Sequence, residues 1–499
     1  MDGLEHGLPP QKKRRRKKLL QRKRLIRSQA DILAPAYVWP VDMHQQQCKY
    51  NSVLDTQNKV MAHLLHVLSR ARLSGDSSAA DQGLCCDIVA GLLDRGNRPH
   101  FLEDDIRRVF TITDTKYLND VVYVASKTNT LGKTWTDVLL ERFSRSAQRW
   151  VSQSLHVLPP SFYSFSERDV VDFRKIHEKD TGVVITSPKF GNLVVFEPCA
   201  HFAKWLPCNF NSFAFSSWLL LNARKLAHLN KKERRSNIKY PLLAIHLGVW
   251  GKPQSAANLG LPSNACPKQI YPAFTKESLQ KGANLRQPKF NKIALEIMEN
   301  DQFLDFVKAV DNLIDAIAPI EGVKGRFLMK KCKEIYDIES PIGSSIFMTI
   351  AINCSPISKM QAHMDFSDDY SSFAVVVCLA SVPFIGGDLV FWQLKTRIHF
   401  DAMDVLVFRS RLFVHGNTDF TVEGLSRKQF KNATEAELKS EKVGGRGSIV
   451  FFSGSGILHA VKKKCSAADA AFINELFRDS VDSFEYDKLP NWLTHLDKI

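Results

Sequence analysis

The sequence contains no apolar run long enough to cross a bilayer. Its longest weakly polar stretch, residues 371–385, is shorter than the roughly 20 residues that a spanning helix needs. Residues 1–30 also lack the apolar core of a secretory signal. The 10 cysteines show no regular framework of the kind that staples small secreted domains. These absences exclude membrane-spanning and disulfide-stapled classes and predict a soluble intracellular protein with reduced thiols.

Several catalytic signatures are also missing from the sequence. It has no glycine-rich loop that could cradle a phosphate and no convincing Ser-His-Asp nucleophile motif. Cys199, His201 and Cys208 form a loose group, but one Cys-x-His and one distant Cys lack the paired spacing of structural zinc sites. We therefore interpret the two cysteines as ordinary core thiols.

Acidic residues are too few to balance the basic ones. The chain has 52 Asp and Glu against 68 Lys and Arg, a formal net charge of +16. Eleven of the basic residues lie between Lys12 and Arg27, too dense to pack, so residues 1–30 should be a disordered basic tail. The tail predicts nuclear import or nucleic-acid binding; a tail with neither role is the alternative. Residues 231–235 are a second basic cluster, either a phosphate contact or a solvated surface.

Hydrophobic periodicity divides the rest of the chain. Residues 31–160 follow a mainly helical pattern. Residues 161–320 mix α and β patterns and end in an amphipathic helix at 301–318, which Pro319 stops. Residues 321–475 carry several short β-like runs separated by Gly, Asp and Ser turns, which is typical of a sandwich or jelly roll, and 476–499 form a C-terminal tail.

Two histidines and an aspartate have the spacing of a metal site. His363 and Asp365 follow a predicted strand, and in extended backbone the first and third side chains point to the same face. His415, at the end of a predicted strand at 411–414, is the best candidate to complete the set. Two His and one carboxylate leave three octahedral positions open, as in non-haem iron(II) oxygenases. His399 is the rival distal ligand, but its spacing to the strand at 404–408 is wrong.

A basic residue and a hydroxyl follow at the start of a later apolar strand. Arg446 and Ser448 lie two residues apart and should share one face. A planar guanidinium suits a bidentate grip on a dicarboxylic acid, and the hydroxyl could add a hydrogen bond to the same carboxylate.

The order of these groups resembles the double-stranded β-helix of 2-oxoglutarate oxygenases. The matching segments are His363-x-Asp365, Gly-Gly-Asp-Leu at 386–389, Asp-Val-Leu-Val-Phe at 404–408, His415 and Arg446-x-Ser448. The resemblance covers about residues 343–453. It implies an α+β chain with a jelly-roll catalytic core and helical N-terminal and flanking regions. It also implies iron(II) held by His363, Asp365 and His415, and 2-oxoglutarate held by Arg446 and Ser448, with O₂ as the other co-substrate.

Within that superfamily, residues 351–353 and 363–368 are similar to the TET/JBP branch, particularly its fungal and protist members. That branch oxidises methyl groups on DNA bases. The resemblance implies a nuclear enzyme that flips a methylated base out of DNA, 5-methylcytosine first, and Asp368 as a contact to that base. The alternative for Asp368 is to cap the following turn together with Asp369.

The chain departs from this branch at two places. Thirty residues separate His415 from Arg446, more than the superfamily usually has, so residues 418–443 are an expected insertion. Gly454 stands where the branch often has a base-contacting His, and His459 is the candidate substitute. Without that contact N6-methyladenine is admissible beside 5-methylcytosine. The alternative functions are a protein or small-molecule hydroxylase on the same fold and a non-enzymatic DNA-binding or transposon-associated protein. The expected state is a monomer.

Overall fold

The computed structural model describes residues 43–49, 106–113, 118–119, 122, 170–176, 181–187, 190–229, 244–253, 268–274, 288–338, 340, 342, 345–355, 360, 363, 365, 368–423 and 445–476. The expected basic tail, the basic cluster at 231–235, most of the expected insertion and nearly all of the C-terminal tail lie outside these residues. The described part of the chain is a mixed α/β structure built on large β-sheets.

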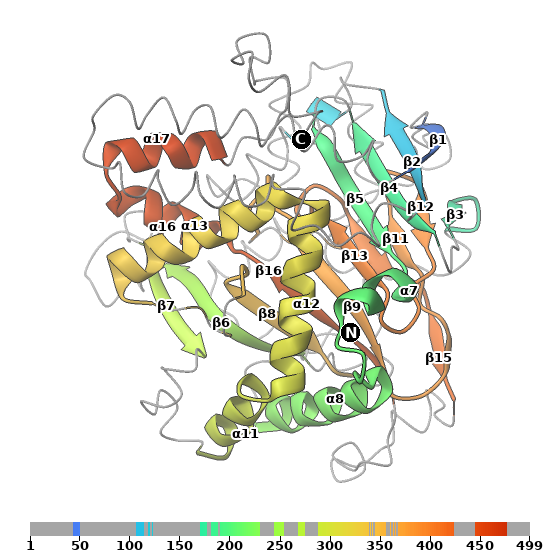
Figure 1. Cartoon of the computed structure of the whole chain (residues 1–499), viewed down its shortest axis with the longest axis horizontal. Helices are drawn as coiled ribbons and strands as arrows, with labels where there is room; N and C mark the ends of the chain where they lie inside the picture. Colours follow the sequence, from blue (N-terminus) through green and yellow to red (C-terminus); the bar gives the residue numbers. More distant parts are fainter. Residues whose placement is uncertain are drawn as a thin grey trace, which may run out of the picture.

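A ten-stranded sheet forms the larger layer (Figure 1). Its neighbouring strands are antiparallel except for β2 and β4, which run parallel. In spatial order the strands are β1 (Met43–Lys49), β2 (Ile106–Ile112), β4 (Gly182–Ser187), β5 (Gly191–Glu197), β13 (Val405–Phe408), β9 (Ala374–Ala380), β16 (Arg446–Phe452), β8 (Thr349–Asn353), β6 (Ala244–Pro253) and β7 (Lys268–Phe274).

Two strands of this sheet come from residues 31–160, for which the sequence pattern predicted mainly helix. β1 pairs with β2, and β2 pairs in parallel with β4, which lies about 70 residues further along the chain. Pairing with strands that are distant in sequence stabilises β1 and β2. The local sequence pattern therefore does not have to indicate a strand at these positions. Most of the remainder of that region lies outside the described residues.

A smaller sheet faces the larger one. Its four strands, in spatial order, are β14 (His415–Asn417), β11 (Leu389–Phe391), β12 (Thr396–Ile398) and β3 (Arg174–Ile176). Phe391 and Ile398 from this sheet pack with Phe196, Val376 and Phe408 from the larger one in one buried apolar cluster. The two sheets therefore enclose a common core, and β14 is an edge strand of the smaller sheet. A separate two-stranded sheet pairs β10 (Phe384–Gly386) with β15 (Phe420–Val422).

Helices cover the other face of the larger sheet. These are α8 (Ser212–Leu229), α11 (Pro288–Met298) and α12 (Asp301–Ile317) (Figure 1). Phe215 and Phe306 from α8 and α12 join Val375 and Phe451 of the sheet in a second buried cluster. The expected helix at 301–318 is confirmed as α12.

The residues around Pro319 differ from the prediction. Asn300 caps the start of α12 by accepting a hydrogen bond from the Phe303 amide (3.0 Å). Pro319 does end α12, but it also begins α13 (Pro319–Tyr336). The first helical position tolerates proline because its missing N–H would have no intrahelical partner there. A helix therefore precedes the first strand of the region in which only short β-like runs were expected.

The C-terminal helices pack against α13. They are α16 (Ser455–Lys464) and α17 (Ala467–Leu476), and Figure 1 shows them on the same side of the molecule as α13. Val323 and Phe327 of α13 share a buried cluster with Ile457 and Val461 of α16. The short segments α7 (Cys199–Phe202) and η4 (Ala203–Trp205) follow β5.

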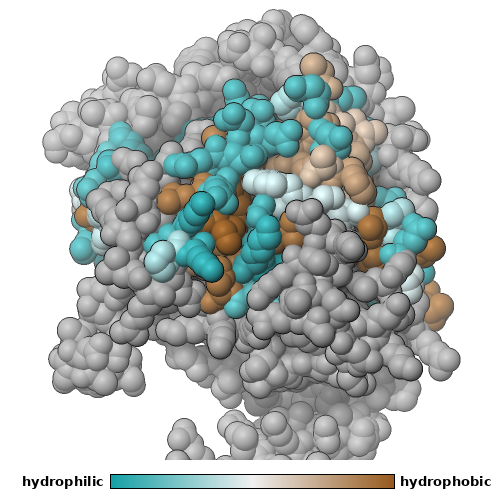
Figure 2. Space-filling view, turned by 90° about the horizontal axis from the view of Figure 1, so that it is seen from below, coloured by the Kyte–Doolittle hydropathy of each residue, from teal (hydrophilic) through white to brown (hydrophobic). Residues whose placement is uncertain are grey.

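No helix in the described ranges has the length and apolar character that a membrane span requires. On the face seen in Figure 2, hydrophilic residues run between hydrophobic ones. Large hydrophobic side chains that are exposed among the described residues lie apart in the chain: Val171 in the turn before β3, Phe213 on α8 and Ile385 on β10.

Candidate metal centre

His415 lies on the inner face of the smaller sheet. It pairs with Phe391 across β11 and β14, and the Phe391 side chain is fully buried between the two sheets. Residues directly opposite each other in an antiparallel pair point to the same side, so the His415 imidazole also points inward. The expected strand at 411–414 is wrong, because these residues form a turn, closed by the Leu412 amide donating to the Arg409 carbonyl (2.9 Å). His415 begins a strand rather than ending one.

His363 is placed opposite His415 by the backbone. The amide of each residue donates to the carbonyl of the other, both at 2.9 Å, which is the hydrogen-bonded form of an antiparallel pair. The two imidazole rings therefore lie on one side, with centroids 4.4 Å apart. Segments that are about fifty residues apart in the chain thus bring two imidazoles together.

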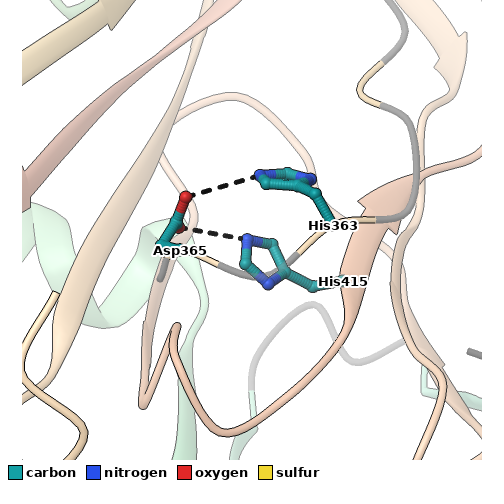
Figure 3. Close-up of side chains that lie close together, drawn as sticks. All are labelled: His363, Asp365 and His415. Atoms are coloured by element: carbon teal, nitrogen blue, oxygen red, sulfur yellow. Dashed lines mark ion pairs between the residues drawn. The ribbon is translucent and has the colours of Figure 1, made fainter. Parts of the chain in front are cut away.

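Asp365 completes the group, as the sequence spacing predicted (Figure 3). Its carboxylate oxygens lie 3.7 Å from His363 Nε2 and 3.4 Å from His415 Nε2. One ligand atom from each of the three residues lies within 4.8 Å of the others, and no other such group of His, Cys, Asp or Glu is found among the described residues. The Asp365 amide donates to the Ser410 carbonyl (3.3 Å), which fixes the segment to the loop after β13.

The contacts of His415 select the tautomer that a metal needs. Its Nδ1 lies 2.9 Å from the Phe413 carbonyl oxygen, which can only accept, so Nδ1 carries the proton. The lone pair is then on Nε2, the nitrogen that faces Asp365. The Phe408 ring packs edge-on against the imidazole, with centroids 4.8 Å apart, and restrains its orientation. Histidines that bind metals are commonly oriented in this way, by a hydrogen bond from the ring nitrogen that does not face the metal.

His399, the alternative distal ligand, contacts two carboxylates instead of the His363, Asp365 and His415 group. His399 Nδ1 lies 2.9 Å from Asp388 and its Nε2 lies 3.1 Å from Asp401. The hydrogen bonds to Asp388 and Asp401 raise the pKa of His399 to about 9. At neutral pH the imidazole is therefore protonated on both nitrogens and has no lone pair for a metal.

The loose Cys/His group does not form a metal site in the described structure. His201 Nδ1 lies 2.9 Å from Glu197, and both side chains are buried. Cys208 is exposed, so its interpretation as a core thiol is wrong, and Cys199 is only partly buried. The sequence pattern does not reveal this difference, because both cysteines lie in a segment of mixed hydrophobicity.

Arg446, at the start of β16, is enclosed by aromatic rings. Its guanidinium carbon lies 5.0 Å from the ring centroids of Phe384 and Phe420 and 5.9 Å from that of Phe400. One terminal nitrogen donates to the Gly387 carbonyl (2.9 Å), whereas Nε is buried without a hydrogen-bond partner. The aromatic cage was not predicted, because it depends on the pairing of β10 with β15, which leaves no pattern in sequence.

Ser448 shares the face of Arg446. Ser448 pairs with Cys378 of β9, whose side chain lies in the cluster between the two sheets. Alternation along β16 therefore places Arg446 and Ser448 on the side that faces the smaller sheet, which also carries His415. The Ser448 hydroxyl accepts a hydrogen bond from the Asn353 side chain (3.0 Å), a contact that the sequence did not reveal.

Asp368 ties the segment that carries His363 and Asp365 to its surroundings. Its Oδ2 accepts from the Ser410 hydroxyl (2.6 Å), its carbonyl accepts from Arg411 (2.8 Å), and its amide donates to the Asp365 carbonyl (3.0 Å). Burial, and next the nearby Asp365 carboxylate, raise the pKa of Asp368 well above its ordinary value. The turn that follows is capped by Asp369, whose carboxylate accepts from the Ser371 amide and hydroxyl.

The two other residues considered for base contact lie nearby in the chain. Gly454 forms an isolated antiparallel bridge with Asp368, so the two positions are direct neighbours. His459 is exposed on α16, one turn into the helix.

No protein-family model matches this chain, and no curated protein matches it in sequence. Solved structures similar to part of it include NgTET1 in complex with 5mC DNA, at 13% identity and TM-score 0.31, covering 57% of this chain and 81% of that one. A 2OG-Fe(II) oxygenase family oxidoreductase from Burkholderia pseudomallei has 13% identity and TM-score 0.21, with 49% and 91% covered. A bsmA homolog from Methylobium petroleophilum PM1 has 12% identity and TM-score 0.23, with 52% and 89% covered. Because these identities and TM-scores are low, the function has to be inferred from the site itself.

Proposed function

We propose that this chain is an iron(II)- and 2-oxoglutarate-dependent dioxygenase that oxidises methyl groups on nucleic-acid bases. The observation that carries the proposal is the convergence of His363, Asp365 and His415 on one point at the inner face of a two-sheet core. Two imidazoles and one carboxylate are a donor set that suits non-haem iron(II) and leaves room for co-substrates. The facing sheets support a double-stranded β-helix as the catalytic core.

His363, Asp365 and His415 would hold the iron. Bound iron(II), together with 2-oxoglutarate and O₂, would supply the oxidising power, and the chain's own residues bind, orient and shield the reactants. The Phe413 carbonyl keeps the His415 lone pair at Nε2, and Ser410 holds the Asp365 backbone in register. These contacts restrain His415 and Asp365 in the orientation in which they would hold the metal.

Arg446 would hold 2-oxoglutarate, with Ser448 beside it. The Arg446 side chain is buried, at 8% exposure, yet no carboxylate among the described residues pairs with it. A buried charge without an ionic partner is costly, and the aromatic cage offsets only part of that cost. An incoming carboxylate would supply the missing partner and could engage the buried Nε donor. The uncompensated charge of Arg446 therefore favours an anionic ligand.

Gly387 should be needed for this grip. Its φ is +82°, and a Cβ added there would lie 2.9 Å from the Arg446 guanidinium carbon. We expect Gly387→Ala to displace the guanidinium and weaken 2-oxoglutarate binding at least tenfold, which isothermal titration calorimetry would measure.

Gly386→Ala is the matched control for this prediction. Gly386 has nearly the same φ, +85°, but a Cβ there meets the Asp419 carbonyl rather than Arg446. Both variants should lose roughly 1–2 kcal/mol because alanine is strained at positive φ. Gly386→Ala should lose more, because its Cβ would lie 2.5 Å from a backbone carbonyl oxygen, which cannot move aside as a side chain can. Equal 2-oxoglutarate affinity in the two variants would contradict the role given to Gly387.

The proposed substrate is methylated DNA, with 5-methylcytosine as the first candidate and N6-methyladenine as the second. A base in a duplex has to be flipped to reach a buried metal, at a cost of roughly a few kcal/mol. Among the described residues only Ser410 donates to the Asp368 carboxylate, and it does so at Oδ2. Oδ1 can therefore accept from the exocyclic amino group of cytosine or adenine. Action on DNA in the nucleus follows from this proposal, together with the basic composition of the chain.

Mass spectrometry of reaction products tests the proposal. Purified full-length protein is incubated with iron(II), 2-oxoglutarate and duplexes that contain 5-methylcytosine, N6-methyladenine or neither. We expect oxidised base in one of the methylated duplexes, and only when 2-oxoglutarate is present. If 2-oxoglutarate is consumed while every duplex stays unchanged, the alternative of a protein or small-molecule hydroxylase takes its place.

A further inference from the structure

Helix α16 connects the candidate metal centre to a group of lysines. Its first residue, Ser455, follows Gly454, which is bridged to Asp368. At 1.5 Å per residue, the last turn, with Lys462, Lys463 and Lys464, lies roughly 10–14 Å along the helix from this starting point. At about 3.4 Å per nucleotide of one strand, this length corresponds to roughly three to four phosphates.

The helix has one apolar and one polar side. Ile457, Leu458, Ala460 and Val461 are buried against α13 and its neighbours. On the opposite side, Ser455, His459 and Lys463 follow one another at intervals of four residues, with Lys462 beside them, and none of these four is buried. We call these four residues the α16 stripe. Residues at this spacing lie above one another on one helix face, so the stripe leads from the metal centre to the lysines.

The lysines of the stripe differ from those of α13. On α13, Lys331 contacts Glu334 (2.9 Å) and Asp469 (3.2 Å), and Lys333 contacts Asp337 (2.7 Å). Within the described ranges, no acidic side chain forms an ion pair with Lys462 or Lys463. Lysines in the last turn of a helix also interact favourably with the helix dipole. That interaction does not depend on the face that carries them, so it does not explain why these lysines share a face with the residues nearest the metal centre.

We propose that the α16 stripe binds the sugar-phosphate backbone of DNA next to the flipped base. This inference rests on the proposed function, because it needs a DNA substrate at the metal centre. A flipped base stays attached to its backbone, so the phosphates that flank it must lie close to the pocket mouth. Lys462 and Lys463 carry positive charge that the described protein does not neutralise, within reach of such phosphates. Contacts of this kind position the duplex without reading its sequence.

The test compares two charge-reversed double variants of the full-length protein. Lys462→Glu/Lys463→Glu alters the stripe, and Lys289→Glu/Lys292→Glu alters two exposed lysines of α11. Fluorescence anisotropy with a 5-methylcytosine duplex gives the affinity over a range of salt concentrations. We expect the stripe variant to lose at least tenfold in affinity and about 1.8 in the slope of log K against log salt, at about 0.9 per lost phosphate contact. The control should bind like wild type, although both variants change the net charge equally.

Lys462→Gln/Lys463→Gln guards against a folding defect at the end of α16. It removes the two charges without adding repulsion, and it should lose the same slope with a smaller loss of affinity. Equal losses in the stripe and control variants, or wild-type affinity in both stripe variants, would overturn the proposed surface. If wild type oxidises methylated DNA and the stripe variants still bind normally, only this surface is rejected. If wild type neither binds nor oxidises DNA, the proposed function fails with it.

Discussion

Replacing His415 with alanine should abolish turnover while leaving the chain folded. The imidazole is one of three groups that converge on the metal position, and its Nε2 already carries the lone pair that a metal requires. Loss of a residue that only supports a ligand typically costs about 10–100-fold in metal affinity or activity, and loss of the ligand itself should exceed that. His363→Ala and Asp365→Ala should behave in the same way. The measurements are iron bound per chain and the rate of 2-oxoglutarate decarboxylation.

His399→Gln is the control for the metal-ligand variants. His399 was the rival distal ligand in the sequence, but Asp388 and Asp401 hold it as a cation. Its replacement should leave iron stoichiometry unchanged. Thermal melts of all the variants separate loss of metal from loss of fold. Full iron binding in His415→Ala, together with loss of iron binding in His399→Gln, would mean that His399 rather than His415 is the distal ligand.

The convergence of the three candidate metal ligands could be predicted because their geometry is partly local. His363 and Asp365 share a face through the alternation of extended backbone, and this needs no knowledge of the fold. His415 required only the chain order of the motifs and a strand nearby, although that strand begins at His415 rather than ending there. Arg446 and Ser448 likewise follow from alternation at the start of one strand.

The supporting residues could not be predicted, because long-range pairing brings them together. Phe384 and Phe420 surround Arg446 only after β10 pairs with β15. Asn353 reaches Ser448 because β8 lies beside β16 in the larger sheet. The placement of β1 and β2 in that sheet is of the same kind, since tertiary pairing overrides local propensity.

Arg446→Lys should raise the Michaelis constant for 2-oxoglutarate by one to two orders of magnitude. A lysine keeps the charge, but a single ammonium cannot reproduce the two parallel hydrogen bonds of a guanidinium fork. It also loses the flat contact with the Phe384 and Phe420 rings and the hydrogen bond to the Gly387 carbonyl. A hydrogen bond to a charged group contributes about 1.5–3 kcal/mol, which corresponds to about 10–150-fold in affinity. Steady-state kinetics at varied 2-oxoglutarate measures the change.

Arg409→Lys is the matched control, because Arg409 is equally buried, at 8% exposure, and also lies over an aromatic ring, Phe373, at 5.4 Å. Arg409 donates to the Phe190 carbonyl and lies over a different ring from those around Arg446, so its replacement should cost stability without changing the Michaelis constant. Both variants exchange a buried guanidinium for an ammonium. A difference between their Michaelis constants therefore reports on the contact with 2-oxoglutarate rather than on burial of the charge. An unchanged Michaelis constant in Arg446→Lys and a raised one in Arg409→Lys would mean that Arg409, rather than Arg446, holds 2-oxoglutarate. It would also leave the buried charge of Arg446 without the anionic partner that its surroundings call for.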